Sequence, residues 1–121
     1  MERLRAVRGA TTLDEDTRDQ VVERTGTLLK EIIDRNRLDP DAIVSIMFTA
    51  TEDIHSEFPA VAARSMGLLD VPLICARELA VTGAVTLCIR VLVSVYSETP
   101  RSELRHVYLE RATPLRTDLH R

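Results

Sequence analysis

The segment from residue 71 to residue 95, VPLICARELAVTGAVTLCIRVLVSV, is almost wholly apolar and yet contains Arg77, Glu78 and Arg90. The charges and Gly83 distinguish it from a membrane span, which needs about 20 consecutive, predominantly apolar residues. We therefore expect core strands here. A charge taken out of water is costly unless an opposite charge meets it, so these charged residues need a partner or a ligand.

The first predicted strand adds a further unexpected charge. In the run RLRAVRGATT, Arg8 has the same parity as Leu4 and Ala6, so we expect its side chain to point inward. Two inward guanidinium groups, those of Arg8 and Arg90, then face the one inward carboxylate of Glu78. The unmatched positive charge predicts a pocket for a small substrate that carries a carboxylate.

Length and composition predict one domain over residues 1–121, because 45% of the 121 residues are apolar and a chain of this size can bury one core. The net charge of -3 and the absence of a basic cluster argue against a nucleic-acid partner. With two Tyr, two Phe and no Trp, the chain also lacks a base-stacking platform.

Location is predicted from the cysteines and from the charged N-terminal run at residues 2–8. Cys75 and Cys88 are the only cysteines and both lie in apolar runs, which is typical of reduced thiols in a cytoplasmic protein. The charged run argues against a signal peptide, and we expect no membrane contact.

Hydrophobic periodicity predicts strands that alternate with helices. Acidic residues at 14–16 lie at the expected start of a helix whose apolar stripe runs from Val21 to Ile33, and Pro59 begins a short helix that ends near Met66. The expected strands cover residues 3–11, 43–49, 71–75, 86–95 and 105–110. This order predicts an α/β (α+β) fold, a mixed sheet with helices on one side.

Several strings, in this order and at this spacing, make the chain similar to a known family. It resembles the small monofunctional chorismate mutases of the trimeric α/β class, which is distinct from the all-helical class. The strings are VRGATT at 7–12, ATEDIHSEFPA at 50–60, VPLICARE at 71–78, VTG at 81–83, CIRV at 88–91 and RHVYLERA at 105–112.

The resemblance implies a pericyclic rearrangement of chorismate to prephenate in phenylalanine and tyrosine biosynthesis. It implies electrostatic stabilisation and substrate preorganisation, with no cofactor, no covalent intermediate and no acid–base step. It also implies a homotrimer in which the sheets form a pseudo-α/β-barrel core and each active site lies between neighbouring subunits.

The resemblance assigns roles to five residues at the centre of the site. Arg8 and Tyr108 hold the carboxylate of the enolpyruvyl side chain, and Arg90 contacts both that carboxylate and the ether oxygen. Glu78, with Cys75 beside it, accepts from the ring hydroxyl.

The remaining site residues that the resemblance implies close the cleft: Phe58, Ala60 and Arg64 from the adjacent subunit, and Leu115 and Arg116 from the tail. The sequence departs from the family pattern at two positions, with Val61 in place of Lys and Ile74 in place of Thr. These departures bear on peripheral contacts to the ring carboxylate.

Each assignment has a simpler alternative. Arg90 and Glu78 could form a structural ion pair, Arg8 could extend off the strand edge into solvent, and Tyr108 could be a core ring with a satisfied hydroxyl. Cys88 is expected to be a small buried hydrophobic residue.

No metal site is expected. His55 and His106 have no carboxylate at ligand spacing, and we regard both as structural.

Two alternative functions remain at this point. One is a trimeric imine or enamine deaminase-like enzyme that clamps a carboxylate with arginine. The other is a non-catalytic trimeric module that binds a metabolite.

Overall fold

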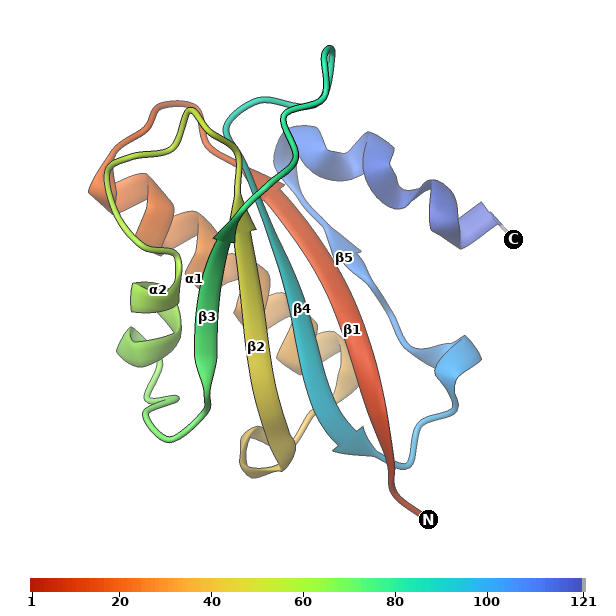
Figure 1. Cartoon of the computed structure of the whole chain (residues 1–121). Coiled ribbons are helices and arrows are strands. Elements are labelled where there is room, and N and C mark those ends of the chain that lie inside the picture. Colours follow the sequence, from red (N-terminus) through yellow and green to blue (C-terminus); the bar gives the residue numbers. More distant parts are fainter. Residues whose placement is uncertain (121) are drawn as a thin grey trace.

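The computed structural model describes residues 1–120, and it describes the side chains of residues 1–115. Five strands form one mixed sheet in the order β3-β2-β4-β1-β5, and α1 and α2 lie against one face of it (Figure 1). β4 is antiparallel to β1 and to β2, whereas β3 and β5 run parallel to their neighbours. The strands are β1 Arg3–Thr12, β2 Ile43–Ala50, β3 Leu73–Arg77, β4 Cys88–Ser97 and β5 Val107–Tyr108. The predicted α+β class and mixed sheet are confirmed.

The long helix α1, Arg18–Asn36, packs its apolar stripe on the sheet. It begins later than the acidic residues suggested, because Thr17 is the N-cap and its side chain accepts from the backbone N–H of Gln20. Asp16 instead accepts from the backbone N–H groups of His55 and Ser56, so it holds the loop before α2.

The core lies between the sheet and the two helices. α2, Ala60–Ser65, begins after Pro59 as expected and covers the β3 end of the sheet. Short 3-10 helices occupy Pro40–Ala42 (η1), Arg101–Glu103 (η2) and Glu110–His120 (η3). The largest side chains buried in this layer are Leu28, Leu29, Ile32, Ile46, Phe48 and Val93.

The second face of the sheet has no helix along most of its length and is apolar. The exposed large apolar side chains on it are Leu4 at 55%, Met47 at 45%, Ile74 at 59%, Leu92 at 38% and Tyr96 at 48%. We call this surface the open face.

Arg8 lies on the open face and is exposed, so the expectation that it points into the core is wrong for the single chain. Arg8 does share a face of β1 with Leu4 and Ala6, as predicted. The face that packs on α1 is the other one, which carries Val7 and Gly9. An apolar open face has the same alternation as a core face, which explains the error.

Three strands, β3, β4 and β5, differ from the sequence-based expectations by two residues at each end. β3 begins two residues late, because Pro72 has no N–H and enters the ladder only through its carbonyl, which accepts from Ile46. β4 begins after Leu87, whose φ of 48° is left-handed. β5 is short because Glu110, with a φ of 52°, turns the chain into η3.

None of the helices among residues 1–120 has both the length and the apolar character needed to cross a membrane.

Candidate active site

The strand register brings the predicted site residues together on the open face. Arg90 of β4 pairs with Ala10 of β1 and with Thr49 of β2, and Ala10 also pairs with Tyr108 of β5. Arg8 lies in the next row. Because partners in register point to the same side of a sheet, these side chains project from one surface.

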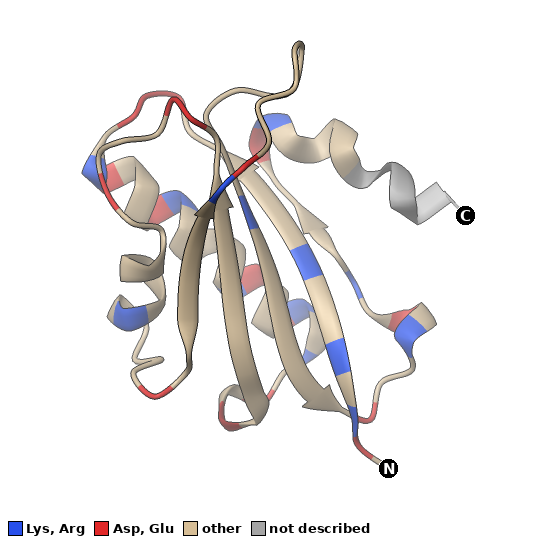
Figure 2. Cartoon of the chain, in the orientation of Figure 1, with Lys and Arg blue, Asp and Glu red and all other residues tan. Residues whose placement is uncertain are grey.

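These residues line a pocket of about 220 Å³, which we call the arginine pocket. Glu78 joins them from the loop after β3, where its backbone N–H donates to the carbonyl of Ala50 at 2.9 Å. Figure 2 shows basic residues along β1 and β4 near the charged end of β3. The pocket is lined by Arg8, Gly9, Ala10, Met47, Thr49, Glu78, Arg90, Val91, Leu92 and Tyr108.

Arg90 and Glu78 form an ion pair inside this pocket. Arg90 Nε lies 3.4 Å from Glu78 Oε2, and the two side chains are 43% and 27% exposed. Arg90 Nε is buried and has no hydrogen-bond partner among the described residues. The pair is therefore neither fully buried nor hydrogen-bonded through Nε, which argues against a purely structural role.

The backbone of Arg8 is fixed by a histidine. Its N–H donates to Nδ1 of His106 at 3.0 Å, so that nitrogen is the acceptor in this tautomer. His106 lies just before β5, and it was predicted to be structural without a known partner. Tyr108 is half-buried against the cluster that contains Ala10 and Cys88.

A second pocket, of about 350 Å³, lies beside α2 and is separate from the arginine pocket within one chain. We call it the Phe58 groove. Phe58 is 67% exposed there. Cys75 lines this groove and not the arginine pocket, and its expected place beside Glu78 stays a prediction. The lining residues are Phe58, Ala60, Arg64, Leu73, Ile74 and Cys75.

Arg77, the remaining charge of the apolar segment, does not line the arginine pocket. Its Nη1 donates to the carbonyls of Thr51 at 2.6 Å and Ile54 at 3.1 Å, so it holds the loop after β2. The sequence predicted that this charge needs a partner or a ligand, and in the structure its partners are these two carbonyl groups.

Asp53 ties the same loop to the start of β4. Its carboxylate accepts from Thr51 Oγ1 and from the backbone N–H of Leu87 at 2.9 Å. Burial raises the pKa of Asp53, but the hydrogen bonds outweigh it and leave the pKa below its usual value of 3.8. Its contacts fix the segment that leads into Arg90.

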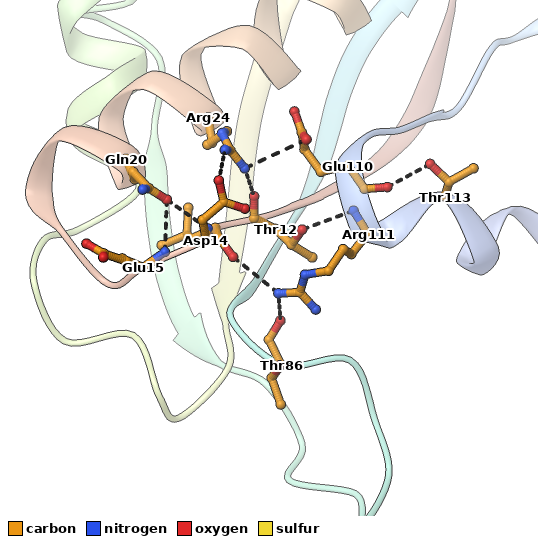
Figure 3. A network of polar contacts seen from close by, with 10 residues as sticks. Thr12, Asp14, Glu15, Gln20, Arg24, Thr86, Glu110, Arg111 and Thr113 are labelled. Atoms are coloured by element: carbon orange, nitrogen blue, oxygen red, sulfur yellow. Dashed lines mark hydrogen bonds and ion pairs between the residues drawn. The ribbon is translucent and has the colours of Figure 1, made fainter.

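The tail is anchored by an arginine network that the sequence did not predict (Figure 3). The backbone N–H of Arg111 donates to Thr12 Oγ1, and its Nη2 donates to the carbonyls of Leu13 and Thr86 at 3.2 and 3.1 Å. Arg24 donates to the carbonyl of Thr12 at 2.6 Å. Arginine side chains at these spacings carry no signal that distinguishes them from surface charges.

The network fixes the start of η3, which carries Leu115. Leu115 packs against the cluster of Ala10, Cys88 and Ala112, as Tyr108 also does. The side chain of Arg116 lies outside the described residues.

Among the described residues, no group of three or more His, Cys, Asp or Glu is arranged to hold a metal ion. Burial raises the pKa of the Cys88 thiol, which keeps it protonated. What the arginine pocket offers is fixed positive charge beside one carboxylate.

Comparison with known proteins identifies the family. Residues 4–119 match the family described as Chorismate mutase type I. The chain belongs to this family. The match favours the isomerase over the deaminase and the non-catalytic module that the sequence left open.

Relatives of this family match the chain over nearly its whole length. It is 42% identical over 117 residues to chorismate mutase AroH of Bacillus subtilis (strain 168), covering 96% of this chain and 92% of the relative. It is also 42% identical to chorismate mutase AroH of Thermus thermophilus, with 96% of each chain covered. A chorismate mutase structure from Clostridium thermocellum superposes with a TM-score of 0.89 at 43% identity, covering 90% of this chain and 97% of that one.

Proposed function

We propose that this chain converts chorismate to prephenate as a cytoplasmic homotrimer, in a site built around the arginine pocket. One observation carries this proposal. In a chain of this family, the guanidinium groups of Arg8 and Arg90 and the carboxylate of Glu78 line one pocket, a combination suited to an anionic substrate with a hydroxyl group.

The open face supports the trimer. A large exposed apolar surface on a small protein is typical of an interaction site, and a closed ring of identical subunits can cover it on every copy. The site is then shared: the arginine pocket of one subunit meets the Phe58 groove of its neighbour. This arrangement brings Phe58, Ala60, Arg64 and Cys75 to the substrate from the other side.

The reaction needs geometry and charge, because it transfers no proton and uses no nucleophile. The ether C–O bond breaks as a C–C bond forms, so the substrate must fold until the reacting carbons are about 3 to 3.5 Å apart. Arg8 and Tyr108 bind the enolpyruvyl carboxylate and hold that folded form.

Arg90 supplies the electrostatic stabilisation. Negative charge develops on the ether oxygen as the C–O bond stretches, and a fixed cation aimed at that oxygen lowers the barrier. The guanidinium group is planar and always charged, so it can contact the carboxylate and the ether oxygen together.

Glu78 balances the other side of the transition state. It accepts from the ring hydroxyl and stabilises the positive charge that develops on the allylic ring. Leu115 closes the cleft from the tail, and Arg116 is proposed to do the same. Val61 and Ile74 leave Arg64 as the cation that the Phe58 groove offers to the ring carboxylate.

The test is a direct assay of the purified protein in a chelator, with no cofactor added. We expect chorismate to disappear and prephenate to accumulate in equal amounts. The Arg90→Ala variant should lose this activity, whereas Arg35→Ala, on the exposed side of α1, should keep it. Failure of the parent protein to consume chorismate would overturn the proposal.

A further inference from the structure

We propose that Thr49 is a positioning residue that holds the carboxylate of Glu78 away from Arg90. The inference rests on the proposed function, because it concerns how the two charges of that site are kept apart.

The evidence is a competition for one oxygen atom. Thr49 Oγ1 donates to Glu78 Oε2 at 2.7 Å, whereas Arg90 Nε lies 3.4 Å from the same oxygen. The first contact has the length of a charge-assisted hydrogen bond. The second does not meet hydrogen-bond geometry, since Arg90 Nε is left without a partner among the described residues. The hydroxyl has thus taken the place that a guanidinium N–H would otherwise occupy.

Thr49 is well placed to impose this arrangement. It lies in β2 and pairs with Arg90 of β4 on one side and with Ala76 of β3 on the other. Glu78 comes two residues after Ala76 and directly follows β3, so Thr49 lies between the two charged residues. Threonine is β-branched and its side chain has few rotamers in a strand, so its hydroxyl is held in position.

The consequence concerns the donors of Arg90. Arginine and a carboxylate readily form a bidentate pair, in which two parallel N–H groups are used. Such a pair with Glu78 would occupy donors that the ether oxygen and the carboxylate of the substrate need. By binding Oε2, Thr49 keeps Glu78 close enough to act and prevents it from closing on Arg90.

Replacement by valine removes the hydroxyl and keeps the shape of the side chain. We expect Thr49→Val to lower kcat by about 10- to 100-fold, the loss typical of one hydrogen bond to a charged group. Thr49→Ser should restore kcat to within a few-fold of the parent, because the donor returns. The matched control Thr27→Val, on the exposed side of α1, should leave kcat unchanged.

A double-mutant cycle with Glu78→Ala separates positioning from general structure. If Thr49 acts through Glu78, Thr49→Val should have no further effect on kcat in the Glu78→Ala background. An equal loss in both backgrounds would overturn the inference, as would a parental kcat for Thr49→Val while Glu78→Ala is slow. A parental kcat for Glu78→Ala would instead overturn the role of Glu78 in the proposed function, and the inference with it.

Discussion

A Cβ atom placed on Gly9 would lie 2.7 Å from Cδ1 of Ile32, so β1 and α1 are in contact at a point where any side chain on residue 9 forces its neighbours to shift. Leu28 Cδ1 and the carbonyl oxygen of Val107 are also within 3.1 Å of that Cβ. Gly9→Ala should therefore lower the free energy of unfolding by about 1 to 3 kcal/mol, the usual cost of overpacking. Urea denaturation measures this change.

Gly26 provides the matched control, because a Cβ there meets no atom within 4 Å. It lies inside α1, where alanine is preferred over glycine. Gly26→Ala should raise the free energy of unfolding by about 0.5 to 1 kcal/mol. Equal effects of the two substitutions would contradict the close approach of β1 to α1.

The carboxylate of Asp53 is expected to stabilise the fold at neutral pH and to lose this effect in acid. Its pKa in the folded state lies below the usual 3.8, so the unfolded chain binds the proton more readily. The stabilisation is complete above the unfolded pKa and is lost as the pH falls through the folded pKa. Asp53→Asn should thus be destabilised at pH 7, and its deficit relative to the parent should shrink below about pH 4.

Urea denaturation at a series of pH values measures this deficit. Glu52→Gln, an exposed neighbour, is the control. A deficit that does not change with pH would show that the charge of Asp53 is unimportant.

The contacts of Arg111 predict an effect on substrate binding. Arg111→Met removes the side-chain hydrogen bonds to Leu13 and Thr86, and the start of η3 is then held less firmly. Because η3 carries Leu115, which packs against the same cluster as Tyr108, we expect KM to rise by more than kcat falls. Steady-state kinetics decides between this result and a fall in kcat alone, which would contradict the anchoring role.

A shared site predicts that two inactive variants can complement each other. Arg90→Ala damages the arginine pocket and Arg64→Ala damages the Phe58 groove. If each site combines the two pockets from different subunits, mixed trimers contain some sites with both halves intact. Refolding the two variants together should restore a fraction of the parent rate.

The same two variants refolded separately and then mixed provide the control. Light scattering should give the mass of a trimer in both samples. If the mixed trimers show no restored activity, the two pockets of one site come from the same chain, and the shared site is contradicted.

Local patterns were sufficient to predict most elements of the fold. The stripe in α1 and the alternation in β1 each bury one face, so the periodicity of the sequence carries the information. Strand ends were less predictable, because they depend on single local features such as the left-handed φ of Leu87 and the hydrogen bond that its N–H donates to Asp53. That hydrogen bond joins residues that are far apart in the sequence.

The candidate site was also predictable from the sequence only in part. Arg8, Glu78 and Arg90 were predicted to face one pocket, and the structure brings them together. The direction of Arg8 was wrong, because the exposed open face has the same alternation of apolar residues as a core face. Residues that act through others, such as Thr49, carry no signal of their own in a sequence.

The central claim is that the guanidinium of Arg90 stabilises the ether oxygen in the transition state, and kcat of Arg90→Lys tests it most directly. Lysine keeps the charge but lacks the planar fork, so it cannot contact the carboxylate and the ether oxygen together. We predict a fall in kcat of about 10²- to 10³-fold. Thermal stability should not change, and Arg35→Lys should match the parent. A kcat within a few-fold of the parent would contradict the claim.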